Sequence, residues 1–297
     1  MTTPDTPLEG VLPVDKPVGP TSHDIVGIAR RALRTRRIGH TGTLDPFASG
    51  LLMLCIGSAT RIAGYLTGMD KRYTAVVRLG VSTDTDDLTG TVIGGAGMGA
   101  EAAALTPAEV EAALARQRGR IEQVPPAYSA KQRDGERAYV AAREGRAVAL
   151  PPVTVHVHEL AITRFGPPEV ELDVLCSSGT YIRAIARDLG AALGTGGHLT
   201  ALRRTAIGAR SVENALPLDA IGDEAAVRSA LLTPLEAIGD RLPRLDVTEI
   251  DAAEIRHGRA LPAAAALDGT WALAAGGRLL AIAESADGRI RPVRVFP

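Results

Sequence analysis

Aromatic side chains are scarce in this chain: Phe, Trp and Tyr make up 3% of its 297 residues, with one tryptophan. Stacking of a base or another planar ligand would therefore depend on very few side chains, which makes each tyrosine informative. Cysteine is also rare. Cys55 and Cys176 both lie in apolar or strand-like runs, which indicates reduced thiols in a core rather than a disulfide.

The chain has no excess of charge of either sign. It contains 33 Lys and Arg residues against 34 Asp and Glu residues, and its pI is near 6.6. The total charge therefore gives no sign of nucleic-acid binding, so a basic surface would have to be local. The first residues are polar, and no apolar run is long enough for a membrane-spanning helix. We expect a cytoplasmic protein with no membrane partner.

The motifs of several cofactor classes are absent. No phosphate-binding lysine follows a glycine run, the glycines of 194–197 do not match a dinucleotide fingerprint, and no G-x-S-x-G segment occurs. His156 and His158 lie two residues apart on one predicted strand and could share a face as metal ligands. No third metal ligand follows at a suitable spacing. The acidic segment STDTDDLTG (82–90) lacks the glycine position and the closing glutamate of a calcium loop. We expect no cofactor and no metal.

The residues that are present predict helices interleaved with strands. Capping residues and helical spacing predict helices within 21–35, 106–117, 179–193 and 248–258, and the expected caps of the first three are Thr21 or Ser22, Thr106 and Thr180. Alternation with a period of two predicts strands within 71–80, 153–165 and 169–178. The order indicates an α+β fold with a mixed, mostly antiparallel sheet.

Three parts are expected along the chain: a flexible tail at 1–9, a large domain at 10–242 and a small β-rich domain at 243–297. In the last part a capped helix is followed by short strand candidates between Gly and Asp-Gly turns. From Leu245 onward the chain has six arginines against seven acidic residues, so charge alone does not mark this part as an RNA-binding domain.

Residues 37–52, RIGHTGTLDPFASGLL, raise the main functional question. Asp45 precedes a proline, and Asp-Pro starts turns, so one interpretation is a structural turn before the buried run 51–56. The other interpretation is that Asp45 is a catalytic carboxylate. Local sequence rules alone favour the turn.

Basic residues gather in two stretches. The first is a cluster of five arginines within 30–37. The second, 124–152, is bracketed by prolines and contains two tyrosines and several Lys and Arg residues. The pattern fits a solvated surface hairpin and a basic RNA-binding insertion equally well.

The segment GHTGTLDPFASGLL is similar to the catalytic segment of the TruB-type pseudouridine synthases, bacterial enzymes that isomerise uridine 55 in the T-loop of tRNA. Other segments resemble that family in the family's own order: VDKPVGPTSHD, KRYTAVVRLG, STDTDD, PPAYSAKQRDGERAYVAAREG, CSSGTYIRAIARDLG and GHLTALRR. The resemblance covers about residues 10–210, and the end of the chain resembles the family's small RNA-binding barrel of PUA type. Each segment alone is a weak signal, whereas the ordered set is specific. It favours catalysis by Asp45 over the structural turn.

The resemblance implies three catalytic residues. Asp45 would be the essential aspartate, which attacks C1′ of the uridine or stabilises positive charge there. Tyr73 would stack on the target base and relay a proton. Arg183 would pair with the aspartate and favour its ionised form. The isomerisation involves no redox or phosphoryl step, which agrees with the missing cofactor motifs.

The resemblance also implies contacts with RNA. His40 would lie beside a flipped-out nucleotide, and Tyr181 and Leu202 would line the uracil pocket. The segment 124–152 would be a thumb-like insertion that clamps the T-arm of tRNA through its phosphates. The expected RNA-binding residues are the basic side chains of the two stretches: Arg30, Arg31, Arg34, Arg36, Arg37, Lys131, Arg133, Arg137 and Arg143.

Three other functions differ from this one in recognisable features. A non-catalytic RNA-binding protein would not need Asp45, Tyr73 and Arg183 together. A guide-RNA-dependent synthase of the dyskerin kind lacks the thumb insertion and relies on partner proteins. A nucleoside hydrolase needs a carboxylate cluster for calcium, which the sequence does not offer. We therefore expect a monomer with no obligatory protein partner.

Replacing Arg133, Arg137 and Arg143 together by alanine is expected to weaken tRNA binding and to flatten its salt dependence. Each lost phosphate contact removes roughly 0.7–0.9 from the slope of log affinity against log salt concentration. Titration of a tRNA transcript at several salt concentrations measures this slope. An unchanged slope would show that the segment is only a solvated hairpin.

Overall fold

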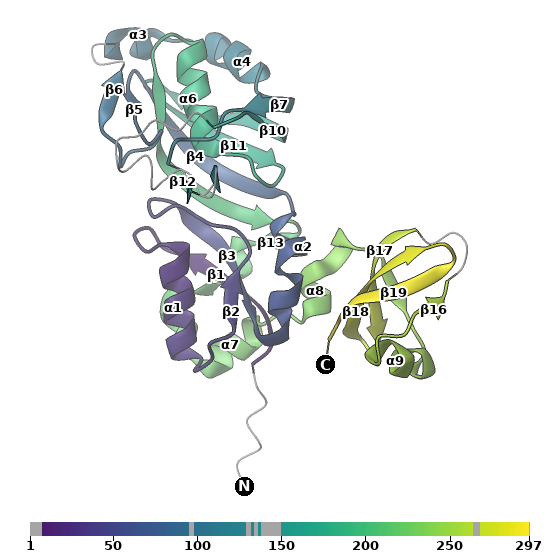
Figure 1. The fold of residues 1–297 in the computed structure, drawn as a ribbon. Coiled ribbons are helices and arrows are strands. Elements are labelled where there is room, and N and C mark those ends of the chain that lie inside the picture. The colour runs from purple at the N-terminus through teal and green to yellow at the C-terminus, as the bar shows by residue number, and fades with distance from the viewer. Residues whose placement is uncertain are drawn as a thin grey trace. The chain divides into compact units, whose positions relative to one another are not determined.

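The computed structural model of the chain describes residues 8–94, 98–128, 132–133, 136–137, 150–263 and 268–296 (Figure 1). Most of the expected tail, 1–7, and most of the expected insertion at 124–152 lie outside the described residues. Contacts between Cα atoms divide the chain into two compact units. The first unit comprises Met1–Pro46, Gly50–Met69 and Ala209–Pro297, and the second comprises Phe47–Ser49 and Asp70–Gly208.

The first unit contains a mixed sheet. Its strand β1 (Gly10–Lys16) pairs antiparallel with β3 (Ser49–Ile56) and parallel with β14 (Leu216–Pro217), and β2 (Ile38–His40) lies antiparallel to β3. Helix α1 (Ser22–Ala32) packs next to β2. The unit also contains α2 (Ala63–Thr67), β13 (Arg210–Ser211), α7 (Glu224–Ala230) and α8 (Pro234–Ile238).

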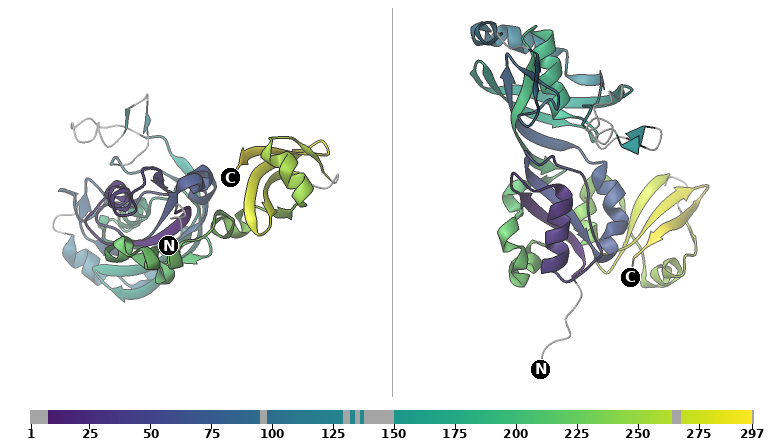
Figure 2. Two further views of the ribbon diagram at one scale, coloured as in Figure 1. Left: turned by 90° about the horizontal axis from the view of Figure 1, so that it is seen from below. Right: turned by 60° about the vertical axis from the view of Figure 1, so that its left-hand side comes forward.

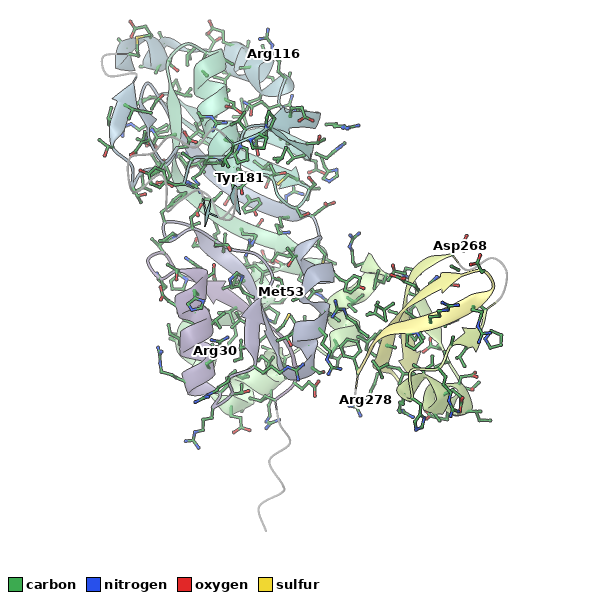
Figure 3. All side chains as sticks on the ribbon, viewed as in Figure 1. Arg30, Met53, Arg116, Tyr181, Asp268 and Arg278 are labelled. Carbon is green, nitrogen blue, oxygen red and sulfur yellow. The ribbon has the colours of Figure 1, made fainter. Side chains whose placement is uncertain are left out.

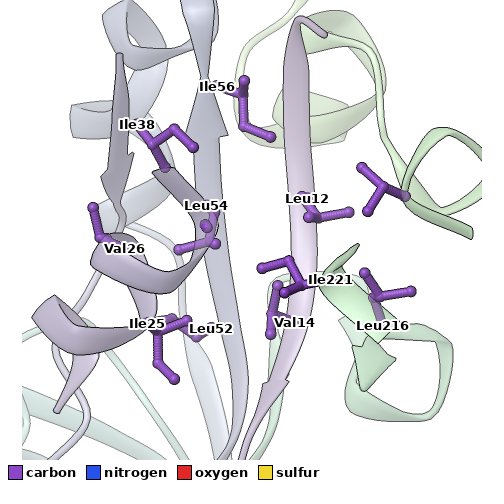
Figure 4. Close-up of a cluster of buried hydrophobic side chains, with 12 residues drawn as sticks. Leu12, Val14, Ile25, Val26, Ile38, Leu52, Leu54, Ile56, Leu216 and Ile221 are labelled. Atoms are coloured by element: carbon purple, nitrogen blue, oxygen red, sulfur yellow. The ribbon is translucent and has the colours of Figure 1, made fainter. Parts of the chain in front are cut away.

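The core of the first unit forms around β3, whose residues after Ser49 are all buried. Leu52, Leu54 and Ile56 alternate along this strand, so they share one face and pack in one cluster with residues of α1 and β1 (Figure 4). The fully buried members of the cluster are Leu12, Val14, Ile25, Ala29, Leu52, Leu54, Ile56 and Val227.

The second unit is built on an antiparallel sheet. Its strand order is β12 (Gly197–Ile207), β4 (Lys71–Leu79), β11 (Glu169–Cys176), β10 (Val153–Gly166) and β7 (Gly119–Gln123). Along β4 every second residue is buried, because helix α6 packs against β4 and β12. The other elements of this unit are β5 (Ser82–Thr83), β6 (Val92–Gly94), α3 (Gly99–Ala104), α4 (Pro107–Ala115), β8 (Gln132–Arg133), β9 (Glu136–Arg137) and α6 itself (Ile182–Ala192).

The backbone of helix α6 contacts the backbone of the segment that leads into β12. A Cβ atom on Gly190 would lie 2.2 Å from the carbonyl carbon of Gly196 and 2.2 Å from the amide nitrogen of Gly197. Gly194 and Gly196 have φ angles of +73° and +75°, which glycine adopts without strain. The glycines at 190, 196 and 197 therefore allow this close approach.

The end of the chain forms a curled five-stranded sheet (Figure 2). Its strand order is β15 (Arg244–Asp246), β17 (Gly269–Ala275), β18 (Arg278–Ala286), β19 (Arg289–Val295) and β16 (Leu261–Pro262). Helix α9 (Glu249–Arg256) contributes to the core of this sheet. The buried residues of that core are Ala252, Ile255, Leu273, Ala275, Leu280, Ala281, Ala283 and Ile290.

The structure confirms the predicted fold class and most of the predicted elements. The helices expected within 21–35, 106–117 and 248–258 are α1, α4 and α9, and the strands expected within 71–80, 153–165 and 169–178 are β4, β10 and β11. Thr21 and Thr106 cap their helices through capping boxes. Within the described ranges, no helix is both long and apolar enough to cross a membrane.

The cap predicted for α6 is wrong. The hydroxyl group of Thr180 donates to the carbonyl oxygen of Ser177 at 2.9 Å, in the turn that precedes the helix. The helix follows Tyr181, whose amide N–H donates to the side-chain oxygen of Gln123 at 2.8 Å. Because Gln123 is distant in the sequence, local capping rules do not identify it. The sequence analysis also assigned no strand to the residues of β12.

We propose that residues 243–297 form a separate domain, because the core of the five-stranded sheet consists of residues from this part of the chain. The fragment 1–242 is therefore expected to remain soluble and to unfold cooperatively, since it keeps the whole cluster around β3. The Arg61 guanidinium donates to the carbonyl of Val295, so truncation removes this link. Thermal unfolding of the fragment beside the full chain measures the outcome. An insoluble fragment would show that the domain boundary is wrong.

Candidate active site

Asp45 lies in the loop between β2 and β3, and this loop is anchored on both sides of the aspartate. The hydroxyl oxygen of Ser22 accepts a hydrogen bond from the Leu44 amide at 2.8 Å and donates to the Leu44 carbonyl at 3.1 Å. The amide of Gly19 donates to the carbonyl of Pro46 at 2.8 Å. Ser22 is buried, whereas Asp45 is half-buried. The start of α1 and the turn before it therefore fix the backbone on either side of Asp45.

His40 stands at the beginning of the same loop. Its Nδ1 accepts a hydrogen bond from the Gly42 amide at 3.3 Å, and the amide of Thr41 donates to the carbonyl of Met53 at 3.2 Å. These bonds define the turn that leads from β2 towards Asp45. His40 and Asp45, which the sequence analysis assigned to one site, thus share one loop of the first unit.

Tyr73 and Leu202 share one face of the sheet of the second unit. Across β4 and β12, Tyr73 pairs with Arg204, and Ala75 pairs with Leu202. Directly opposed residues of an antiparallel pair share a face, as do residues two apart on one strand. Tyr73 is 7% exposed and Leu202 is 8% exposed. The structure therefore brings two residues of the predicted uracil pocket together.

Two buried cations lie on the same face as Tyr73. Lys71 precedes it by two residues on β4, and Arg204 opposes it on β12. Burial and then the charge of Arg204 lower the pKa of Lys71 to about 8. Neither Lys71 nor Arg204 could be assigned a role from the sequence, because lysine and arginine are rarely buried and no local signal indicates their burial.

Arg183 is buried near the N-terminal end of α6. Its guanidinium donates to the carbonyl of Thr85 at 2.9 Å and to the carbonyl of Tyr128 at 2.9 Å. The carboxylate of Asp87 lies 3.6 Å from the same group, and both side chains are almost fully buried. These three oxygens orient the guanidinium. Pairing of Arg183 with Asp45 stays a prediction.

Asp87 is a residue that the sequence analysis missed. Its carboxylate accepts hydrogen bonds from the hydroxyls of Thr85 at 2.8 Å and Thr89 at 2.6 Å, and from the Thr89 amide at 2.9 Å. The Thr83 hydroxyl donates to the Asp87 carbonyl at 2.7 Å. Such donors replace the water that a carboxylate loses on burial. The sequence signal for this loop was the alternation of Thr with Asp in STDTDDLTG. The side chains of Thr and Asp favour turns in which they hydrogen-bond the nearby backbone.

Tyr181, which Figure 3 labels, is fixed through hydrogen bonds of its backbone. The side-chain amide of Gln123 accepts from the Tyr181 N–H at 2.8 Å and donates to its carbonyl at 3.0 Å. Gln123 is 1% exposed, so its two bonds are shielded from water. Tyr181 and Arg183 therefore start α6 from a defined position, and both belong to the second unit with Tyr73 and Leu202.

The first predicted RNA-binding stretch forms a basic surface at the end of α1. Arg30 is labelled in Figure 3 and donates to the Ile38 carbonyl at 2.8 Å. The exposed members are Arg30, Arg31, Arg34, Arg36 and Arg37. In the second stretch, Lys131 and Arg143 lie outside the described residues, whereas Arg133 and Arg137 belong to the hairpin of β8 and β9.

Three family models match consecutive parts of the chain. The model described as TruB family pseudouridylate synthase (N terminal domain) matches residues 30–182, more than half of the chain. The chain belongs to the TruB family of pseudouridine synthases. The family's tRNA pseudouridylate synthase B C-terminal domain matches 183–238, and tRNA Pseudouridine synthase II, C terminal, matches 242–297. The prediction of a TruB-type isomerase is thereby confirmed.

Curated TruB-family relatives match nearly the full chain. A protein of Mycobacterium sp. (strain KMS) named tRNA pseudouridine synthase B is 46% identical over 292 residues, which cover 97% of this chain and 96% of that protein. The protein of the same name from Arthrobacter sp. (strain FB24) is 45% identical over 304 residues and covers 97% of each chain. The one from Mycobacterium tuberculosis (strain ATCC 25618 / H37Rv) is 44% identical over 292 residues, with 97% and 95% covered.

Solved structures share the fold. An H/ACA RNP bound to a substrate RNA containing 2′-deoxyuridine includes a chain with a TM-score of 0.73 and 23% identity, covering 97% of this chain and 85% of that one. A Cbf5-Nop10-Gar1 complex gives a TM-score of 0.73 and 24% identity, with 97% and 84% covered. These likenesses confirm the pseudouridine synthase fold.

The lowered pKa of Lys71 predicts that stability depends on pH. Its pKa is about 8 in the folded chain against an ordinary value of 10.5, so between these values the unfolded chain binds more protons. The free energy of unfolding therefore rises with pH through this window. Relative to Lys71→Met, the wild type is expected to gain about 3 kcal/mol between roughly pH 7 and pH 11. Urea unfolding of both proteins measures the difference, and a pH-independent difference would contradict it.

Proposed function

We propose that this chain converts uridine 55 in the T-loop of tRNA to pseudouridine, the specific form of the uridine isomerisation that its family membership implies. The observation that supports this most directly is the Asp45 loop. It holds a half-buried carboxylate between two anchored residues, Leu44 and Pro46, within the segment that matches the family's catalytic motif. The relatives named tRNA pseudouridine synthase B support tRNA as the substrate.

Asp45 acts at C1′ of the target nucleotide. The N1–C1′ bond breaks, the uracil rotates, and C5 forms the new bond to C1′. The proton on C5 leaves and N1 gains a proton, so atoms and charge balance. A carboxylate attacks C1′ or stabilises the positive charge that develops there, as in glycoside hydrolysis. No oxidant, reductant or transferred group enters from outside, which is why we propose that no cofactor is needed.

Arg183 keeps Asp45 ionised and oriented in this proposal. A guanidinium next to a carboxylate favours the charged form of that carboxylate. Arg183 suits this role because two carbonyls and Asp87 already fix its guanidinium. A preoriented charge loses little free energy to reorganisation when the reaction begins.

The second unit supplies the proposed uracil pocket. Tyr73 stacks on the target base and relays the proton from C5, while Leu202 and Tyr181 line the pocket. A uridine in a folded loop cannot be reached while it is stacked, so the nucleotide is flipped out, and His40 fills space beside it. The shared buried face of Tyr73 and Leu202 supports this assignment.

The T-arm of tRNA contacts the basic surface at the end of α1 and the insertion at 124–152. The exposed arginines within 30–37 support this, since phosphate contacts supply most of the affinity for RNA. We further propose that the protein acts as a monomer in the cytoplasm without a guide RNA. The Cbf5 chains in H/ACA complexes are under 25% identical and support only the fold.

Asp45→Asn is expected to lower the single-turnover rate of pseudouridine formation at least about a thousandfold, because the amide keeps the shape but loses the charge and nucleophilicity. Binding of tRNA should stay within about twofold of the wild type. Carbodiimide primer-extension mapping of an unmodified tRNA transcript measures the rate. Asp251→Asn, at a half-buried aspartate of α9 in the first unit, is the control. A rate within tenfold of the wild type would refute the assignment.

Tyr73→Phe is expected to retain stacking on the base but to lose the proton relay. The isomerisation should slow by about 10²–10⁴-fold, the usual contribution of a positioned acid or base, while affinity for tRNA is kept. Tyr65→Phe, at a half-buried tyrosine of α2, should match the wild type. Normal turnover by Tyr73→Phe would show that Tyr73 only stacks on the base and relays no proton.

A further inference from the structure

Helix α6 carries two arginines one turn apart, and both reach the same two segments of the second unit. These segments are the acidic loop 83–89 and residues 124–128, which follow β7. Arg183 donates to Thr85 and Tyr128. Arg187 contacts Asp86 in the first segment and Val124 in the second, so that each segment is held twice.

The contacts of Arg187 are specific. Its Nη1 lies 3.2 Å from the carboxylate of Asp86, its Nη2 donates to the carbonyl of Val124 at 2.9 Å, and its Nε donates to the carboxylate of Asp188 at 2.8 Å. All three nitrogens of the guanidinium are used. A planar guanidinium in such a position ties separate segments together in a way that a lysine cannot reproduce fully.

The residue that Arg187 holds in the acidic loop is conformationally unusual. Asp86 has a φ of +60°, which is uncommon for a residue other than glycine, and its neighbour Asp87 contacts Arg183. Only 11% of the Asp86 side chain is exposed. Burial raises the pKa of Asp86, and the charge of Arg187 opposes this change. The guanidinium of Arg187 therefore holds the buried side chain of this residue.

We infer that Arg187 is a positioning residue: by fixing Asp86 and Val124, it aligns the Thr85 and Tyr128 carbonyls and the Asp87 carboxylate that orient Arg183. This inference rests on the proposed role of Arg183 in the reaction. It assigns Arg187 an effect on the chemical step through Arg183. Without Arg187 the two segments lose one of their two anchors on α6, and Arg183 then samples orientations that do not serve catalysis.

A double-mutant cycle tests this dependence. Single-turnover rates at saturating tRNA transcript are measured for Arg187→Met, Arg183→Met and the double variant. Arg187→Met is expected to slow the isomerisation about 10–100-fold with little change in tRNA affinity, since small misplacements of a catalytic group cost up to this much. In the Arg183→Met background the same change should slow the reaction by less than about twofold, because the residue through which it acts is already gone.

Arg118→Met is the matched control. Arg118 also donates to a backbone carbonyl, that of Leu160 at 2.8 Å, and pairs with a carboxylate, that of Glu111. Its side chain is 32% exposed against 27% for Arg187. Thermal unfolding of both variants compares their loss of stability. The isomerisation rate of Arg118→Met should stay within about twofold of the wild type. Arg187→Lys should recover part of the lost rate, because it restores the charge and one donor.

Two results would overturn the inference. If the effects of Arg187→Met and Arg183→Met multiply in the double variant, Arg187 acts independently of Arg183. If Arg187→Met and Arg118→Met slow the reaction equally at equal loss of stability, Arg187 is only structural. Should Arg187→Met not fold, the same cycle with Arg187→Lys decides between these results. An Arg183→Met variant as fast as the wild type would instead overturn the proposed role of Arg183, whereas Asp45→Asn tests the function separately.

Discussion

A guanidinium buried as deeply as that of Arg183 needs oxygen atoms that replace the water it has lost. The second unit meets this requirement with two backbone carbonyls and one carboxylate from segments far apart in the sequence. The acidic loop and the segment after β7 are therefore drawn to the start of α6. Gln123 reinforces the arrangement by bonding both backbone groups of Tyr181. The segments around the proposed uracil pocket are thus placed by the oxygen atoms that the buried Arg183 guanidinium requires.

The division of arginines between buried and exposed positions explains how a chain with no net excess of basic residues can belong to a family that acts on RNA. Some arginines are buried inside the protein: Arg183 lies beside Asp87, and Arg204 is 1% exposed. The arginines at the end of α1 are exposed instead. The total charge averages over these two populations, and only the exposed one contributes to a surface potential that RNA can sense.

Elements with a strong local pattern were predictable from the sequence. The alternation along 71–80 and 153–165 gave β4 and β10, and the threonines at positions 21 and 106 gave correct helix starts. The cap of α6 and the strand β12 were not found, because Gln123 and the glycines near 196 act through tertiary contacts. Sequence similarity selected Asp45, Tyr73 and Arg183. Asp87, Lys71 and Arg204 were missed, since nothing local distinguishes a buried charge from an exposed one.

The contact of Gly190 with Gly196 and Gly197 limits how this part of the protein can vary. Because main chain meets main chain at this point, the spacing of α6 and β12 is set by peptide groups and not by the volume of side chains. Substitutions elsewhere in the core of the second unit can then alter its stability while the spacing between Arg183 and Leu202 is preserved. The arrangement of Arg183 and Leu202 therefore tolerates sequence changes in the surrounding core, while three glycine positions accept no side chain.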